Sequence, residues 1–311
     1  MYSAAINLYI ANHNAPSITD LVEFLSAECL DAGLKPIISN QLLTKTKNII
    51  IECFGKGLNK EIKKNFCKTD PRLILVATEI VKDGMLNSTE PGEDEKQEGW
   101  YNTQSKYWIE RSKYFFDIVD YFGTIVCVSE EIYDSLKAMN LRADLVYWPP
   151  KFYGSLQNFH DDWGKKNIQT LKTHEFLYSG SLTSYRTSQL EALYAAGITV
   201  CSVKQDTPDV VRHKVSGQAG LTLGPKHYKS TRQLSKMRVR WCLNNMYPFI
   251  MERCPAATDL DDFCLFYSDV EELIELCKDI GAIYPKSIEN NYAFALATKD
   301  LPSVFLPLVE S

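Results

Sequence analysis

Short apolar runs alternate with longer amphipathic segments along most of this chain. The runs have the length of buried strands, and the amphipathic segments have the spacing of helices with one apolar face. Strands are expected at 6–10, 35–39, 48–54, 73–78, 124–128 and 144–148, and later at 175–178, 198–203, 248–251 and 263–266. Helices are expected at 20–32, 58–65, 101–120, 130–139, 187–196, 207–213, 235–245 and 269–278. This alternation predicts α/β domains with mainly parallel sheets and helices on both faces.

The segment 149–172 interrupts the alternation. It is polar, contains glycine and lacks periodicity, which is typical of a linker between domains. At 311 residues the chain is long enough for two domains. We therefore expect a first domain at 1–155, a second at 156–285, and a helical tail at 286–311 that packs back on the first domain.

Composition narrows the class of protein. Hydrophobic residues make up 45% of the chain and charged residues 23%, as in ordinary globular proteins. A net charge of −5 argues against nucleic acid as a partner. No apolar run is long enough to span a membrane, and the first residues lack the basic start of a signal peptide. The lysines of 56–68 leave open a peripheral contact with a membrane surface.

The nine cysteines are scattered along the sequence. None forms a Cys-x-x-Cys pair or a Cys/His cluster with the spacing of a zinc site. Reduced thiols in the cytoplasm are therefore expected, without a metal site built from cysteine.

The most informative segment begins at His174. The strand predicted at 175–178 leads into Ser179-Gly180-Ser181, and a helix with Arg186 near its start follows. In open α/β sheets, ligands bind at the carboxyl ends of the strands. The N–H groups at the start of a helix attract anions. This turn is therefore a candidate for binding a phosphate group.

Basic and acidic groups follow in the same half of the chain. Lys236 and Arg238 open a helix, and Glu252 ends the apolar strand that comes after it. Cations could stabilise a leaving diphosphate, and a carboxylate could accept hydrogen bonds from two ribose hydroxyls. The sequence therefore predicts phosphate-binding and hydroxyl-binding groups at one edge of one domain.

Four stretches together resemble glycosyltransferases of the GT-B architecture. They are Val126-Cys-Val-Ser129, Phe176-Leu-Tyr-Ser-Gly-Ser-Leu182 with Arg186, Ser235-Lys-Met-Arg238 with Glu252, and 263–274. The resemblance implies two Rossmann-like domains that face each other across a cleft, with the nucleotide sugar on the second domain and the acceptor on the first. Within this group the chain is most similar to bacterial glycosyltransferase-like proteins of the spore-maturation CgeB type.

Two features depart from the pattern of these enzymes. From Glu252, the nearest downstream acid is Asp259, one position short of the Glu-x7-Glu spacing of many retaining members. Cys242-Leu-Asn-Asn-Met246 replaces the usual run of small residues after the donor-binding helix. Both departures leave the stereochemistry and the donor open.

Six residues are expected to bind the donor: Gly180, Ser181, Arg186, Lys236, Arg238 and Glu252. No metal would be essential, because the basic residues would stabilise the leaving diphosphate. The alternatives are an ordinary turn for the glycine, a surface position for Arg186, and a solvated helix face for Lys236 and Arg238. For Glu252 they are an ion pair with Arg253 or a turn cap.

Two residues are candidates for the general base. His13 follows the first strand and Glu79 ends the strand 73–78, so both stand at the carboxyl edge of the first sheet. Either could take the proton of an acceptor hydroxyl if the enzyme inverts. The alternatives are a polar loop position for His13, and a helix cap or buried ion pair for Glu79.

The function expected from the sequence is transfer of a sugar from a nucleotide-sugar donor to an acceptor hydroxyl. The acceptor would be a glycan, a lipid-linked molecule or a protein. A nucleotide-sugar epimerase of the same architecture and a non-catalytic GT-B-like binding or scaffold protein are the two alternatives, because one fold serves many functions.

Overall fold

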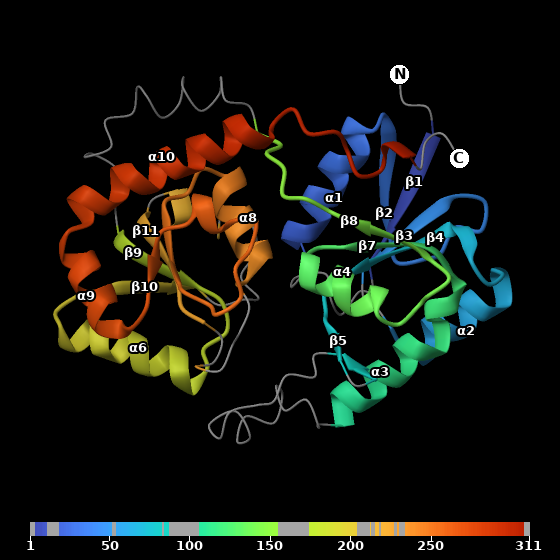
Figure 1. Ribbon diagram of the computed structural model, residues 1–311, viewed down its shortest axis with the longest axis horizontal. Helices are drawn as coiled ribbons and strands as arrows, with labels where there is room; N and C mark the ends of the chain where they lie inside the picture. The colour runs from blue at the N-terminus through green and yellow to red at the C-terminus, as the bar shows by residue number, and fades with distance from the viewer. Residues whose placement is uncertain are drawn as a thin grey trace. The chain divides into compact units, whose positions relative to one another are not determined.

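The computed structural model describes residues 4–10, 19–51, 54–82, 84–86, 106–154, 174–203, 212, 215–217, 219–226, 229 and 234–307. The chain divides into two units (Figure 1). The first comprises Met1–Pro149 with Pro302–Ser311, and the second Pro150–Leu301. Each unit has its own parallel sheet. The predicted α/β class with two Rossmann-like sheets is confirmed.

The first sheet has six parallel strands in the order β2-β1-β3-β4-β7-β8. The strands are β1 (Ala4–Tyr9), β2 (Leu34–Ser39), β3 (Lys47–Ile51), β4 (Asp70–Ala77), β7 (Phe122–Cys127) and β8 (Asp144–Tyr147). The helices are α1 (Thr19–Asp31), α2 (Lys56–Asn65), α3 (Lys106–Ile118), the short η3 (Val119–Tyr121) and α4 (Glu130–Lys137). A small antiparallel pair is formed by β5 (Val81–Lys82) and β6 (Met85–Leu86).

The strand order of this sheet reverses between β1 and β3. Because crossover connections are right-handed, α1 covers one face, and α2, α3 and α4 cover the other (Figure 1). Strands that are covered on both faces consist of almost continuous apolar residues. In β4, Leu73, Ile74, Leu75 and Val76 are all fully buried, so the composition of this run alone predicts a strand.

The connection between β2 and β3 contains no helix. Residues 40–46 are bound by two buried side chains, Asn7 of β1 and Asn48 of β3. Asn7 Nδ2 donates to the carbonyl of Gln41 at 2.9 Å and to Asn48 Oδ1 at 2.8 Å. Asn48 binds the carbonyl of Leu43 at 2.9 Å and its N–H at 2.8 Å. Buried backbone groups need partners, so the two asparagines make this helix-free crossover possible.

A buried carboxylate anchors residues 302–307 in the first unit. Glu28 of α1 is 1% exposed. It accepts hydrogen bonds from Trp148 Nε1 at 2.9 Å and from the Val304 N–H at 3.1 Å. Its backbone carbonyl accepts from Ser303 Oγ at 2.9 Å. The last described segment is therefore an internal part of this unit.

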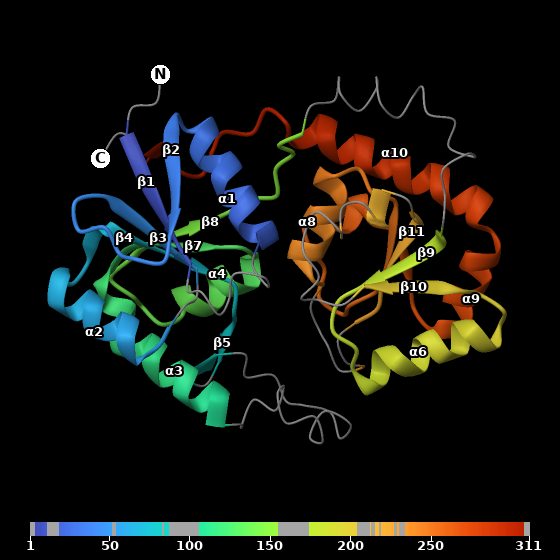
Figure 2. The same ribbon diagram turned by 180° about the vertical axis from the view of Figure 1, so that it is seen from behind.

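The second sheet has five parallel strands in the order β10-β9-β11-β12-β13. They are β9 (His174–Ser179), β10 (Val200–Val203), β11 (Ala219–Gly224), β12 (Phe249–Glu252) and β13 (Phe266–Tyr267). The helices are α6 (Ser184–Ala195), α8 (Lys236–Asn244), the short η4 (Asp261–Phe263), α9 (Val270–Lys278) and α10 (Ile280–Thr298). Figures 1 and 2 show α6 along one side of this sheet and α10 along the other.

Several expected elements differ from those in the structure. The helix expected in the tail begins earlier, at Ile280, and α10 belongs to the second unit, so that only Pro302–Ser311 are grouped with the first. The strand expected at 263–266 is a 3-10 turn followed by the short β13. The helix expected at 207–213 lies almost wholly outside the described residues.

The sequence prediction was wrong about the middle of the second sheet, because it left out β11. This strand, Ala219-Gly-Leu-Thr-Leu-Gly224, is fully buried between β9 and β12. Glycine is disfavoured in strands, so the segment did not have the pattern of one. The neighbours explain the glycines: a Cβ on Gly220 would lie 2.6 Å from the carbonyl oxygen of Glu175, and one on Gly224 would lie 2.1 Å from Met251 Sδ.

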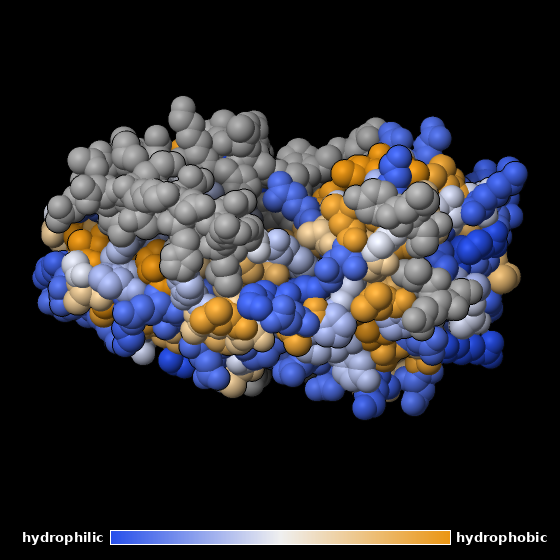
Figure 3. All heavy atoms as spheres, turned by 90° about the horizontal axis from the view of Figure 1, so that it is seen from above, coloured by the Kyte–Doolittle hydropathy of each residue, from blue (hydrophilic) through white to orange (hydrophobic). Residues whose placement is uncertain are grey.

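One face of the molecule is mixed in character. Hydrophilic and hydrophobic residues are interspersed on the face shown in Figure 3. No helix in the described parts of the chain is both long and apolar enough to cross a membrane.

The replacement of Asn48 by alanine is expected to lower the free energy of unfolding by about 3 kcal/mol, because it leaves buried groups of the β2–β3 crossover without partners. Urea-induced unfolding followed by circular dichroism measures this change. Asn65→Ala, at the exposed end of α2, is the control and should change stability by less than about 0.5 kcal/mol. A loss of stability in Asn48→Ala no larger than in this control would contradict the role of Asn48.

Candidate functional site

The strand order of the second sheet reverses beside β9. The next strand in sequence, β10, lies on one side of β9, and β11 lies on the other. Ligands of open α/β sheets bind outside the carboxyl ends of the strands at such a point. Two loops begin at this point. They are 180–183, which follows β9, and 225–226, which follows β11. These two loops define the candidate site.

Arg186 joins the two loops. Thr183 caps α6 by accepting a hydrogen bond from the Arg186 N–H at 3.2 Å, and the arginine is 4% exposed. Its guanidinium donates to the backbone carbonyls of Ser181 at 3.0 Å, Pro225 at 3.2 Å and Lys226 at 3.0 Å. The side chain expected to grip a diphosphate thus fixes the spacing of the loops from inside.

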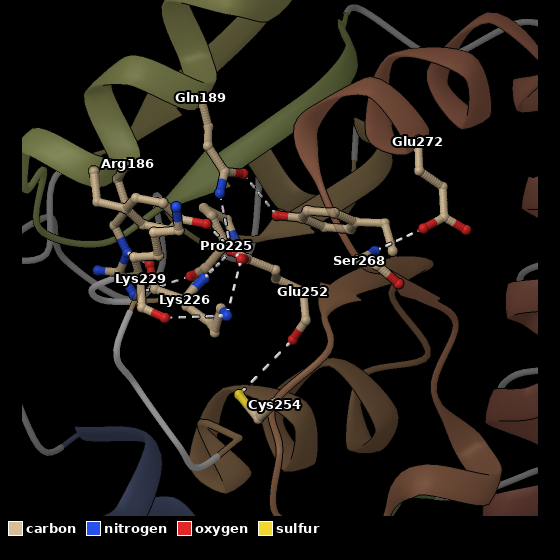
Figure 4. A network of polar contacts seen from close by, with 11 residues as sticks. Arg186, Gln189, Pro225, Lys226, Lys229, Glu252, Cys254, Ser268 and Glu272 are labelled. Carbon is tan, nitrogen blue, oxygen red and sulfur yellow. Dashed lines mark hydrogen bonds and ion pairs between the residues drawn. The ribbon is translucent and has the colours of Figure 1, made fainter.

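Glu252, at the end of β12, is the centre of a second network (Figure 4). It is 1% exposed. Its Oε1 accepts from the Tyr185 hydroxyl at 2.5 Å and lies 3.2 Å from Lys226 Nζ. Its Oε2 accepts from Gln189 Nε2 and from the Lys226 N–H, both at 2.9 Å. Both oxygens therefore have protein partners, so the carboxylate expected to hold a ribose stabilises the edge of the sheet.

Two tyrosine hydroxyls in this network act as donors. Tyr267 donates to Gln189 Oε1 at 3.1 Å, and Tyr185 donates to Glu252. Burial raises the pKa of both tyrosines above the ordinary value, and the nearby negative charge of Glu252 raises it further. Both hydroxyls therefore keep their protons at neutral pH and orient Gln189 and Glu252.

Gly180 and Arg238 meet directly after β9. Gly180 has a φ of +141°, a backbone conformation that residues with a Cβ atom rarely adopt. A Cβ there would lie 2.6 Å from Arg238 Nη2 and 3.2 Å from the Tyr178 hydroxyl oxygen. The guanidinium carbon of Arg238 lies 5.9 Å from the centre of the Tyr178 ring, and that of Arg186 lies 5.8 Å from it. Glycine is required here because of this φ, and the absence of a Cβ also leaves room for the guanidinium of Arg238.

Arg238 has an unused hydrogen-bonding group. Its Nη1 is buried and has no hydrogen-bond partner among the described residues. A buried cationic donor without an acceptor is unfavourable, and such groups in proteins commonly bind a ligand, an ion or water. Because the neighbouring Arg186 is also cationic, this position is electrostatically suited to an anion.

Lys236 forms an ion pair with a carboxylate of the same unit. Its Nζ lies 2.8 Å from Asp259 Oδ1, and its side chain is only 7% exposed. Asp259 is the acid that falls one position short of the Glu-x7-Glu spacing. The ion pair ties the start of α8 to the loop after β12, and so it fixes the helix that carries Arg238.

The candidate base residues lie in the first unit. Glu79 follows β4 at the carboxyl edge of the sheet and is half-buried. His13 lies outside the described residues, so its position relative to Glu79 stays a prediction. Within the described segments, no group of three or more histidine, cysteine, aspartate or glutamate side chains is arranged to hold a metal ion.

A pocket of about 370 Å³ lies at the carboxyl edge of the second sheet. Its lining residues follow β11, β12 and β13: Lys226, Arg253, Cys254, Pro255, Ala257, Asp261 and Ser268. The sequence does not predict this pocket. The sequence feature that indicates it is the set of polar residues directly after apolar strands. This feature is hidden, because the sequence predicts no strand at β11 and places the strand of β13 a few residues too early.

Comparison with known proteins identifies the fold. No family model and no curated protein matches the chain. The solved structure of sucrose-phosphate synthase from Thermosynechococcus elongatus aligns with a TM-score of 0.51 at 8% identity, over 99% of this chain and 96% of that one. At this identity the similarity establishes a shared two-domain fold alone, consistent with the GT-B architecture.

Two further structures align less closely. A complex of S. aureus MnaA with UDP has a TM-score of 0.47 at 11% identity, over 94% of this chain and 93% of that one. The N-terminal domain of Candida albicans trehalose-6-phosphate phosphatase has a TM-score of 0.49 at 10% identity, over 100% and 96%. The similarity to CgeB-type proteins expected from the sequence stays a prediction.

Replacing Glu252 with alanine is expected to lower the free energy of unfolding by about 3 kcal/mol, because Lys226 loses its partner and two further donors lose their acceptor. Guanidinium-induced unfolding measures the effect. Glu289→Ala, exposed on α10, is the matched control. Equal stability of the two variants would show that the Glu252 carboxylate is not needed for the fold and is free to serve a ligand.

Proposed function

We propose that this chain is a glycosyltransferase, which moves a sugar from a nucleotide-sugar donor to an acceptor hydroxyl without an essential metal. The observation that carries the proposal is the buried Nη1 atom of the half-buried Arg238 beside Gly180, at the point where the strand order of the second sheet reverses. The fold shared with sucrose-phosphate synthase is consistent with it but does not itself specify an activity.

The chemistry of sugar transfer calls for a cation at this place. The acceptor oxygen attacks the anomeric carbon, the bond from that carbon to the phosphate oxygen breaks, and the nucleoside diphosphate leaves with the electron pair. A fixed guanidinium stabilises the negative charge that develops on the leaving group. Arg238 is already held against Tyr178, so little reorganisation is needed when charge develops.

In this proposal the expected donor residues have two kinds of role. Gly180 and Ser181 offer the backbone of the loop after β9, and Arg238 binds the phosphate oxygens, which a guanidinium can contact in bidentate fashion. The other three hold the site in shape through internal contacts: Arg186, Lys236 and Glu252. Only a subset of the expected residues would therefore touch the donor.

The acceptor side of the reaction belongs to the first unit in this proposal. A glycan, a lipid-linked molecule or a protein would supply the hydroxyl group. His13 or Glu79 would take its proton in an inverting reaction, as a general base must reach the acceptor oxygen within hydrogen-bond distance.

Arg238→Gln is expected to weaken the binding of nucleoside diphosphates by about 10-fold to 150-fold, the equivalent of one charge-assisted hydrogen bond of about 1.5–3 kcal/mol. Isothermal titration calorimetry with UDP, GDP, ADP and CDP, in EDTA and then in Mg²⁺, measures the affinity. Arg142→Gln, an exposed arginine of the first unit, is the matched control and should bind as the natural chain does.

Other outcomes would decide against parts of the proposal. Unchanged affinity in Arg238→Gln would remove this arginine from the site, and binding only in Mg²⁺ would contradict metal independence. If no diphosphate binds, the non-catalytic alternative is favoured. Epimerisation of a nucleotide sugar without acceptor, followed by NMR, would instead identify an epimerase.

A further inference from the structure

The pocket at the carboxyl edge of the second sheet is linked to the proposed phosphate site through Arg186. Lys226 lines the pocket, and its carbonyl accepts a hydrogen bond from Arg186. Arg186 also binds the Ser181 carbonyl in the loop that carries Gly180. Since β9, β11, β12 and β13 are adjacent parallel strands, their carboxyl ends form one row, with neighbours about 4.8 Å apart. A nucleoside diphosphate whose phosphates lay after β9 and whose nucleoside followed this row would have its base at the pocket.

Asp261 supplies an acceptor to the pocket. Thr258 Oγ1 donates to its Oδ1 at 2.8 Å, and the side chain makes no other hydrogen bond within the described part of the chain. The short helix η4 fixes its backbone, because the Asp261 N–H donates to the Thr258 carbonyl at 3.1 Å and the Cys264 N–H donates to the Asp261 carbonyl at 3.2 Å. The pocket therefore contains a held carboxylate with free acceptor capacity.

Arg253 supplies the complementary donor. Its backbone N–H binds the Tyr267 carbonyl at 2.8 Å, which fixes the residue beside β13. The residue is exposed, and its guanidinium carbon lies 4.1 Å from the centre of the ring of Phe266, which does not line this pocket. In the residues that the structure describes, no acceptor is bound to this guanidinium. Lys226, by contrast, is already paired with Glu252. The pocket is thus lined by one exposed arginine whose guanidinium has no acceptor in the described residues and by one carboxylate with acceptor capacity left.

Guanine matches this combination better than the other common bases do. It presents two acceptors, O6 and N7, on one edge, which arginine binds in bidentate fashion. It also presents N1–H and N2–H donors side by side, and a carboxylate has only acceptors to offer. Uracil has a single N–H between two carbonyl oxygens, which a carboxylate repels, and adenine and cytosine lack the paired donors.

We propose that this pocket binds the guanine base of the nucleotide, so that the donor is a guanosine diphosphate sugar. Asp261 would accept from N1–H and N2–H, and Arg253 would donate to the O6/N7 edge. This inference rests on the proposed function and extends it, because it names the class of donor that the same site takes.

Calorimetric titration of the full chain with GDP, UDP, ADP and CDP tests the choice of base. GDP is expected to bind at least tenfold more tightly than the other three, as a bidentate contact to a base provides discrimination of this size. Inosine diphosphate, which lacks the 2-amino group, should bind more weakly than GDP for the same reason.

Asp261→Asn tests the contact itself with almost no change in shape. The variant is expected to lose tenfold or more in GDP affinity and to gain affinity for xanthosine diphosphate, whose C2 oxygen can accept a hydrogen bond from the asparagine amide. If Asp261 only stabilised the local structure, its replacement would not shift the binding preference from GDP to xanthosine diphosphate. Asp262→Asn, the same change at the next residue, which is exposed and does not line this pocket, should keep the preference for GDP.

The outcomes separate this inference from the proposed function. If the natural chain prefers GDP and Asp261→Asn shifts the preference to xanthosine diphosphate, both the guanine assignment and the proposed function are supported. Tighter binding of UDP, ADP or CDP, or a preference for GDP that Asp261→Asn leaves intact, overturns the guanine assignment and leaves the proposed function standing. If none of the four diphosphates binds, both are overturned.

Discussion

The edge of the second sheet depends on one buried guanidinium. Arg186 binds the loop after β9 and the loop after β11 through three backbone carbonyls. Without Arg186 the carbonyls of Pro225 and Lys226 would lose their donor, and the loops could move apart, although the Ser181 carbonyl also accepts from the Tyr178 hydroxyl. The same contact sets the position of Lys226, whose N–H and Nζ both reach Glu252. A side chain that is bound to the backbone of both loops thus shapes the edge at which we propose that a ligand binds.

Charge compensation decides which basic residues remain for a ligand. A buried charge is stable only when it is paired and hydrogen-bonded, and Lys226 and Lys236 satisfy this condition with Glu252 and Asp259. Arg238 differs, because its buried Nη1 has no acceptor in the described residues. Asp259 stands one position short of the Glu-x7-Glu spacing, and in the structure it pairs with Lys236 and so holds α8 in place. Basic residues that look equivalent in the sequence therefore have different roles.

Most of the fold could be predicted because apolar periodicity is a local property. The runs in β4 and β7 are buried on both faces, so their composition alone marks them as strands. The strand β11 could not be recognised in this way, because Gly220 and Gly224 are explained by the close approach of Glu175 and Met251. Neighbours that are distant in sequence decide whether a glycine-rich segment is a loop or a central strand.

The sequence by itself determined the α/β class, most element positions, and the chemical types gathered after β9 and β12. Only the tertiary structure decided which of those groups have hydrogen-bonding capacity left for a ligand. Arg186 and Glu252 are hydrogen-bonded to partners from other elements, whereas Arg238 is left with a buried donor. The physical reason is that hydrogen-bond partners and desolvation arise from contacts between distant segments, and spacing along a chain does not encode them.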